Sequence, residues 1–234
     1  MADNAQQSKT IGRWVRGAWA VFRKDVRLEV RDRYGVSMLL MFMLSALILG
    51  RFAMGQEPLS ENVQSGLLWI IIVFAASIGL GRAFISEEER GTILLLRLHA
   101  AAAEVFTGKL LYNFVLLLFV NLVMVGAFVF LLNVDVHIVT LLVATLALGS
   151  LGLAGASTLL AAIVARSANR APMLPVLVFP ILIPLLLSVV NATGASLSES
   201  GSWGEAAESL WTLFGFSGVV ITASIMLFDY IWHD

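Results

Sequence analysis

The chain alternates between long uncharged apolar runs and short polar segments. Six runs contain no Asp, Glu, Lys, Arg or His: residues 34–50, 62–81, 110–134, 138–165, 171–198 and 209–228. An α-helix rises 1.5 Å per residue, so about 20 apolar residues cross a hydrocarbon core roughly 30 Å thick. The pattern therefore predicts an all-α polytopic membrane protein. We expect six transmembrane helices at about 34–52, 66–85, 109–132, 138–165, 172–191 and 209–231.

The segment that precedes the first run has a different periodicity. Over residues 11–33, apolar side chains recur at spacings of three and four, and basic side chains occupy the other faces. This pattern predicts an amphipathic interfacial helix. It is compatible with a simple membrane-surface anchor and with an elbow helix that docks against the ends of the spans. Residues 1–10 are polar, and we expect them to be a disordered tail.

Composition supports a membrane protein, and the placement of charges predicts the orientation of its spans. The chain has 234 residues, of which 59% are hydrophobic and only 13% charged, far below the roughly 25% of a soluble domain. With six spans, every Lys and Arg except Arg51 falls on one side of the membrane. The positive-inside rule makes that side cytoplasmic. We therefore expect a multi-pass protein of the bacterial inner membrane with both termini in the cytoplasm and a single membrane domain over residues 34–232.

Several kinds of chemistry are disfavoured by what the sequence lacks. Ion-coupled carriers usually place charged groups inside the membrane, and the six runs contain none. Gly108-Lys109 lacks the remaining residues of a phosphate-binding loop. The three histidines, His99, His137 and His233, lie outside the runs and lack metal-ligand spacing, and there is no cysteine. We expect no catalytic, cofactor-binding or metal-binding residues, so the chain is not predicted to be an enzyme.

The fifth run contains prolines inside a predicted span. Pro180 and Pro184 must remove backbone hydrogen bonds there, and Pro175 lies nearer its start. These three residues are a candidate hinge in a moving helix. A static kink that only shapes packing explains them equally well.

The inner loop between the second and third spans is a candidate docking segment. It contains an acidic turn, Glu87-Glu88-Glu89-Arg90-Gly91-Thr92. We expect this turn to lie in water, Gly91 to end the preceding helix, and Thr92 to begin a short apolar helix over residues 93–98, which includes Leu95 and Leu98. A plain solvated turn without a partner is the alternative reading.

Here the sequence resembles a known family. The turn, the apolar residues after it and Gly108-Lys109-Leu110-Leu111 are similar to the inner loop of ABC-2-type permeases. A closer resemblance is to the CcmB family of cytochrome c maturation permeases. It extends over roughly residues 20–230 and includes Phe22-Arg23-Lys24-Asp25 with Glu29, the loop from Arg82, Gly152–Ala156 and the proline-rich run 174–184.

This resemblance implies an ABC-2-type permease architecture and a role in haem export or handling for c-type cytochrome biogenesis. It implies a separate cytoplasmic ATPase that docks on residues 87–98, a homodimer, and other cytochrome c maturation membrane proteins as partners. Haem is then a candidate substrate, no cofactor is assigned to the chain itself, and ATP acts through the partner. Membrane lipid is a further partner, and no nucleic acid is expected. The alternatives are a generic ABC-2-type exporter of lipid, drug or polysaccharide, and a membrane scaffold or intramembrane enzyme that transports nothing.

Overall fold

A computed structural model describes residues 2–55, 59–80, 87, 91–93, 96, 98, 100–165 and 170–233. These residues form helices α1 (Ala2–Asp32), α2 (Tyr34–Met54), α3 (Glu61–Gly79), α6 (Ala102–Leu132), α7 (Val139–Ala165), α8 (Arg170–Leu197) and α9 (Trp203–His233). All helices except α1 are long and apolar enough to cross a membrane, which confirms six candidate spans. No strand occurs in the described part of the chain.

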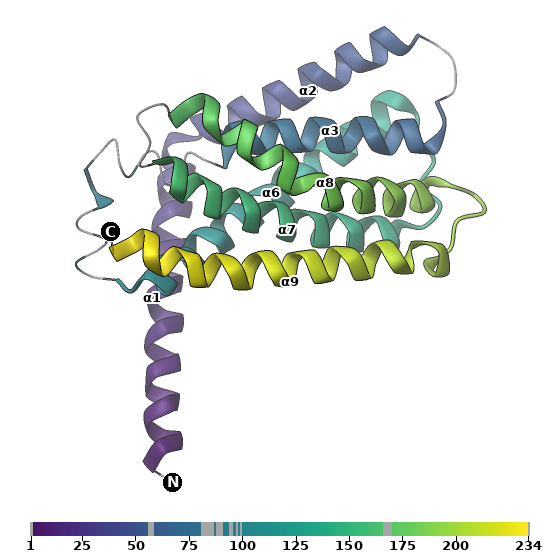
Figure 1. Cartoon of the computed structure of the whole chain (residues 1–234). Helices are drawn as coiled ribbons and strands as arrows, with labels where there is room; N and C mark the ends of the chain where they lie inside the picture. Colours follow the sequence, from purple (N-terminus) through teal and green to yellow (C-terminus); the bar gives the residue numbers. More distant parts are fainter. Residues whose placement is uncertain are drawn as a thin grey trace.

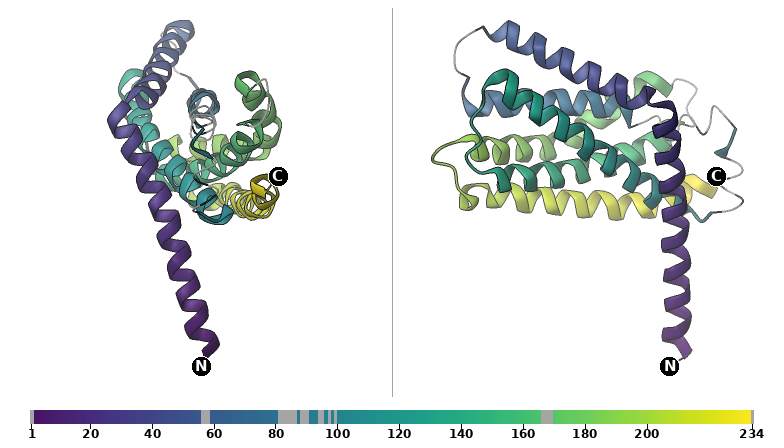
Figure 2. Two further views of the ribbon diagram at one scale, coloured as in Figure 1. Left: turned by 90° about the vertical axis from the view of Figure 1, so that its left-hand side faces the viewer. Right: turned by 180° about the vertical axis from the view of Figure 1, so that it is seen from behind.

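The six spans run side by side, and α1 lies across one end of them. Figure 1 shows α1 roughly perpendicular to the spans, with the C-terminus at the same end of the bundle. The connections after α2, α6 and α8 lie at the other end (Figures 1 and 2). We call these the α1 end and the opposite end. This arrangement requires an even number of spans and places α1 and the starts of α6 and α8 at the same end of the bundle.

Several helix boundaries differ from the predicted ones: α6 begins at Ala102, α8 continues to Leu197 and α9 begins at Trp203, each six or seven residues beyond the predicted span. The backbone of α1 begins at Ala2, so the prediction of a disordered tail over residues 1–10 is wrong for residues 2–10. Ala, Gln and Lys in that segment are good helix formers, and they extend a helix already nucleated by the amphipathic part. The second span begins earlier than predicted, at Glu61, because Ser60 is extended at its N-cap.

The opposite end is closed by backbone and side-chain hydrogen bonds. The side-chain oxygen of Ser202 accepts a hydrogen bond from the backbone N–H of Glu205 (3.2 Å), so α9 begins there as one continuous helix. The backbone N–H groups of His137 and Ile138 both donate to the carbonyl of Ser196. The ring Nδ1 of His137 lies 2.8 Å from the carbonyl of Leu197. This histidine therefore fastens a loop to the end of α8.

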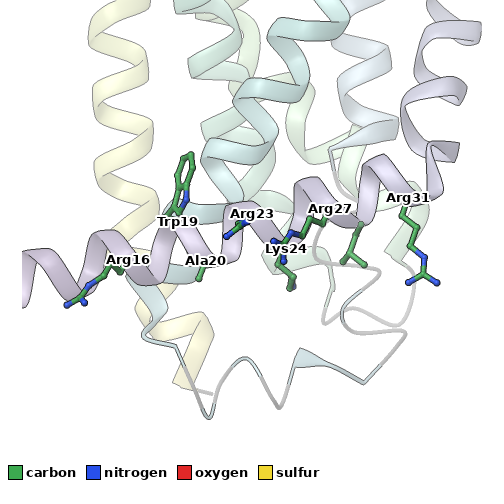
Figure 3. A pocket seen from close by; sticks show the side chains of 8 residues that line it. Arg16, Trp19, Ala20, Arg23, Lys24, Arg27 and Arg31 are labelled. Atoms are coloured by element: carbon green, nitrogen blue, oxygen red, sulfur yellow. The ribbon is translucent and has the colours of Figure 1, made fainter.

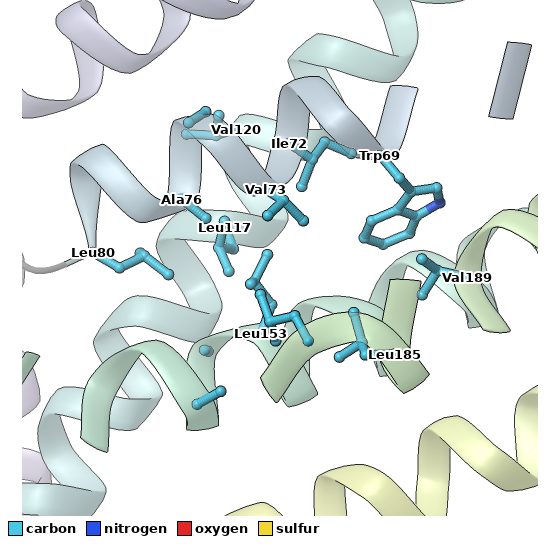
Figure 4. Close-up of a cluster of buried hydrophobic side chains, with 14 of the residues drawn as sticks. Trp69, Ile72, Val73, Ala76, Leu80, Leu117, Val120, Leu153, Leu185 and Val189 are labelled. Carbon is cyan, nitrogen blue, oxygen red and sulfur yellow. The ribbon is translucent and has the colours of Figure 1, made fainter. Parts of the chain in front are cut away.

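The core is the contact between α3, α6, α7 and α8, where Gly149 and Gly152 of α7 allow side chains of α3 and α8 to approach closely. Figure 4 shows Trp69 and Ile72 of α3 facing Leu153 of α7 and Leu185 of α8. The indole N–H of Trp69 donates to the Thr193 hydroxyl of α8 (2.9 Å). In lipid, helices associate through such tight packing and through polar contacts and not through the hydrophobic effect.

Two asparagines of α6 join this helix to α7, as expected for polar groups in lipid. Asn113 donates to the Thr158 hydroxyl (2.8 Å) and Asn121 to the Ser150 hydroxyl (2.9 Å). All four side chains are fully or almost fully buried. These two bonds fix the register of α6 against α7.

The candidate hinge lies in α8, which is helical across the prolines. Figure 1 shows the first half of α8 tilted relative to its second half. Pro180 and Pro184 lie on its exposed side, and the Ser188 hydroxyl donates to the carbonyl of Pro184 (3.0 Å). The side chain of Pro175 lies outside the described residues. Movement of α8 at this bend stays a prediction.

Gly149 tests the close packing of the spans. A Cβ atom at this position would lie 2.4 Å from the ring of Trp69 and 2.8 Å from Val189. We expect Gly149→Ala to destabilise the fold by about 1–3 kcal/mol, the usual cost of overpacking, measured as a lower thermal unfolding midpoint in detergent. The matched control is Gly126→Ala in α6, where nothing lies within 4 Å. Equal midpoints for the two variants would contradict this packing.

Candidate functional site

At the α1 end, the loop between α3 and α6 is fastened to two helices by a cluster of four charges, of which three are buried and one, Lys24, is partly exposed. The cluster consists of Lys24 and Asp25 on α1, Glu87 in the loop and Lys109 on α6. Lys109 lies 3.2 Å from Asp25 and 3.6 Å from Glu87, nitrogen to oxygen. Lys24 lies 3.3 Å from Asp25 and forms an ion pair with Glu87. We call these four residues the ion cluster.

Local sequence explains why these side chains meet. Asp25 is four residues after Val21 and seven after Ala18, so all three lie on the face of α1 that packs against α6. A close helix crossing brings the two backbones together, because a Cβ on Gly108 would lie 2.6 Å from the carbonyl oxygen of Ala18. Lys109 follows Gly108 directly and is therefore held at the crossing.

A second pair of residues extends the contact by one helical turn. Glu29 follows Asp25 by four residues on α1, and Tyr112 follows Lys109 by three on α6. The Tyr112 hydroxyl donates to Glu29 (3.0 Å), and the other carboxylate oxygen of Glu29 accepts from the backbone N–H of Val36 (2.8 Å). Val36 lies in the first turn of α2, which starts after Arg33 in a left-handed conformation. Glu29 thus links the corner between α1 and α2 to α6.

Burial makes the ion cluster strongly interdependent. Lys109 is 1% exposed, and Asp25 and Glu87 are each 6% exposed. Burial alone opposes the ionisation of Glu87, but Lys109, with hydrogen bonds from Lys24 and Thr92, holds the pKa of its carboxyl below the usual 4.5. Glu87 is therefore a carboxylate at neutral pH. Two cations and two anions balance one another, which is the condition for burying them at all.

The loop next to Glu87 turns back on itself at Gly91. Gly91 has φ +67°, a left-handed conformation that favours glycine. This turn lets Thr92 approach Glu87: its backbone N–H donates to the Glu87 carbonyl (3.0 Å) and its hydroxyl to the Glu87 carboxylate. The carbonyl of Thr92 then accepts the N–H of Leu96 (3.2 Å), so a helical turn follows, as expected. Ala101 is extended, which ends this segment before α6.

The predicted docking residues do not all share one environment. Glu87 is buried, which corrects the expectation that the whole acidic turn lies in water: two lysines on neighbouring helices draw its carboxylate inward. Leu98, by contrast, is 79% exposed. Glu88, Glu89, Arg90 and Leu95 lie outside the described residues. Sequence reasoning missed Lys24, Asp25 and Lys109 as part of this site.

The architecture and this junction define a polytopic helical membrane protein in which a loop is tied to an interfacial helix and a span. The model of the CcmB protein family matches residues 16–229, and the chain belongs to this family. Heme exporter protein B of Bradyrhizobium diazoefficiens is 26% identical over 187 residues, 79% of this chain and 84% of that protein. Heme exporter protein B of Rhodobacter capsulatus is 28% identical over 191 residues, 81% of this chain and 85% of that protein.

The charge balance of the ion cluster gives a direct test. We expect Lys109→Gln to destabilise the protein by about 3–5 kcal/mol, because two carboxylates would remain buried beside a single lysine. Adding Asp25→Asn should recover part of this loss, because it restores the balance of charge. Thermal unfolding in detergent measures both effects, with the exposed Arg16→Gln as the control. Additive losses in the double variant would show that the two residues do not interact.

Proposed function

We propose that this chain is the permease subunit of an ATP-driven haem exporter that serves c-type cytochrome maturation. Membership of the CcmB family and two relatives named Heme exporter protein B support this function. We further propose that a separate ATPase subunit docks on residues 87–98 and that this segment transmits movement to the spans. The observation that carries the docking proposal is the position of the segment, which is anchored at Glu87 and exposed at Leu98.

In this proposal the α1 end faces the cytoplasm of a bacterial cell, and the chain lies in the inner membrane. The basic residues at that end support this orientation. Two copies of the chain would pair, each with one ATPase, and other membrane proteins of cytochrome c maturation would receive or hold the haem. The chain supplies no phosphate-binding loop, so energy must reach it from the ATPase.

The ion cluster gives the proposed mechanism a route for force. A push on residues 87–98 reaches Lys24 and Asp25 on α1 and Lys109 on α6 through charged contacts that are costly to break. From α6, contacts with α7 and α9 spread the movement through the bundle. Rigid-body tilting of packed helices is a common response to such a push. Pro175, Pro180 and Pro184 in α8 remain the candidate hinge.

The residues of the acidic turn have different roles in this proposal. Glu87 acts inside the protein, as the anchor of the segment. Glu88, Glu89, Arg90, Gly91, Thr92, Leu95 and Leu98 are the candidate docking residues, with Gly91 and Thr92 also shaping the turn. A charge reversal that includes Glu87 would therefore disturb the ion cluster as well as the docking surface, so a docking test must leave Glu87 intact.

Gene deletion followed by haem staining tests the function, and Leu98 tests the docking. We expect deletion to abolish covalent c-type cytochromes and the wild-type gene to restore them. We expect Leu98→Ala to weaken copurification of the ATPase by about tenfold or more, because burying a leucine side chain in a partner contributes roughly 1.5–3 kcal/mol, without lowering the unfolding midpoint. The control is Phe52→Ala at the opposite end, where Phe52 is 86% exposed.

The deletion strain and the Leu98→Ala variant test the haem-export function and the docking site separately. Normal c-type cytochromes in the deletion strain would contradict haem export and favour a generic exporter or a scaffold. Normal cytochromes and normal ATPase copurification in Leu98→Ala would contradict the docking assignment alone.

A further inference from the structure

One face of α1 carries a row of basic side chains that the ion cluster does not use. A shallow groove runs along this face, and Figure 3 shows the side chains that line it. The groove is lined by Arg16, Trp19, Ala20, Arg23, Lys24, Arg27, Leu28 and Arg31. The arginines follow one another at spacings of seven, four and four residues, which places them on one side of the helix over four turns. The groove is therefore a continuous basic surface.

This basic surface points away from the bundle. Ala18, Val21 and Asp25 are each 6–7% exposed and lie on the opposite face of α1, toward α6. The arginines, by contrast, are exposed to the surroundings. Since α1 lies across the ends of the spans (Figure 1), the surface is held where the spans leave the hydrocarbon core. This is the depth of the lipid headgroups on the α1 side.

Trp19 lines the edge of the groove that lies toward the spans. Its ring is 56% exposed and packs against Phe22, with the ring centroids 5.0 Å apart. Figure 3 shows Trp19 directed along the spans, toward the membrane, while Arg16 and Arg31 point away from them. Tryptophan prefers the boundary between acyl chains and headgroups. The groove thus joins an apolar contact to several cationic ones, as a phospholipid requires.

The arginines of the groove carry a charge that the described part of the chain does not pair. Among the residues that the structure describes, no carboxylate pairs with Arg16, Arg23, Arg27 or Arg31; the only side-chain bond recorded for them joins Arg16 to the carbonyl of Gly12. Lys24 alone is engaged, because it reaches Glu87 and Asp25. Four neighbouring guanidinium groups form a favourable site for phosphate oxygens, which they bind in bidentate fashion.

We propose that this groove is a binding site for the headgroups of acidic phospholipids in the membrane leaflet at the α1 end. The arginines hold the phosphate groups, and Trp19 contacts the start of the acyl chains. The position of α1 at headgroup depth favours lipid over a soluble acidic protein as the occupant. The inference does not depend on haem as the substrate or on the ATPase. It does connect lipid to the ion cluster, because Lys24 lines the groove and also holds Glu87.

Lipid binding by the purified chain tests this proposal. The full-length protein is stripped of lipid in an uncharged detergent and titrated with phosphatidylglycerol or phosphatidylethanolamine of the same acyl chains, and bound lipid is counted by native mass spectrometry. We expect at least about tenfold tighter binding of phosphatidylglycerol to the wild-type protein. The variant Arg16→Gln/Arg23→Gln/Arg27→Gln should lose most of this preference, since each basic residue near a membrane contributes roughly fivefold.

A matched control and the unfolding midpoint make the outcome decisive. Arg13→Gln/Arg51→Gln removes two arginines that do not line the groove, and we expect it to keep the preference. The groove variant should unfold at the wild-type midpoint, because its substituted side chains are exposed. Equal binding of the two lipids by the wild-type protein would overturn the proposal. A preference for phosphatidylglycerol that persists in the groove variant would also overturn it. If the groove variant kept its lipid preference but lost an associated ATPase, the surface would belong to a protein partner.

Discussion

A lysine at the end of a membrane span can be buried only if carboxylates are brought to it, and Lys109 imposes this requirement on the α1 end of the protein. Its ammonium group is 1% exposed and lies within 4 Å of carboxylates from two other segments. Removing such an ion from water costs several kcal/mol, which only well-placed opposite charges offset. The helix α1, the loop and α6 must therefore come together at one place. Gly108 and the apolar face of α1 make that approach sterically possible.

The burial of Lys109 also determines how firmly the loop between α3 and α6 is attached to the helices. In the proposed mechanism, a turn anchored through Glu87 passes a push from the ATPase to α1 and α6, whereas a solvated turn would absorb it by bending. The extension through Glu29 and Tyr112 includes the corner that leads into α2. Three elements at the α1 end thus behave as one connected junction. The basic groove lies on the far face of the same helix, so Lys24 places the lipid surface and the junction in direct contact.

Much of the fold could be predicted from the sequence, because membrane spans depend on long uncharged runs. The six uncharged runs correspond to six candidate spans whose described connections after α2, α6 and α8 lie together at one end of the bundle. Burial at the junction was not predicted, because Glu87 and Lys109 lie in polar segments that the pattern assigns to water. One signal was available: Asp25 continues the apolar face of Ala18 and Val21, where an acidic residue requires a buried partner. The start of α1 was missed because helix extension depends on the segment that nucleates it.

Hydrogen exchange, followed by mass spectrometry on the purified protein in detergent, tests most directly whether the ion cluster holds these elements as one unit. The comparison is between the wild-type protein and Glu87→Gln, which removes one charge and keeps the shape of the side chain. The account predicts faster amide exchange in residues 91–100, in the second half of α1 and in the first turns of α6, with unchanged exchange in residues 133–138 and 198–202 at the opposite end. Faster exchange confined to the immediate neighbours of residue 87 would contradict it, because the loop would then be independent of the helices that it contacts.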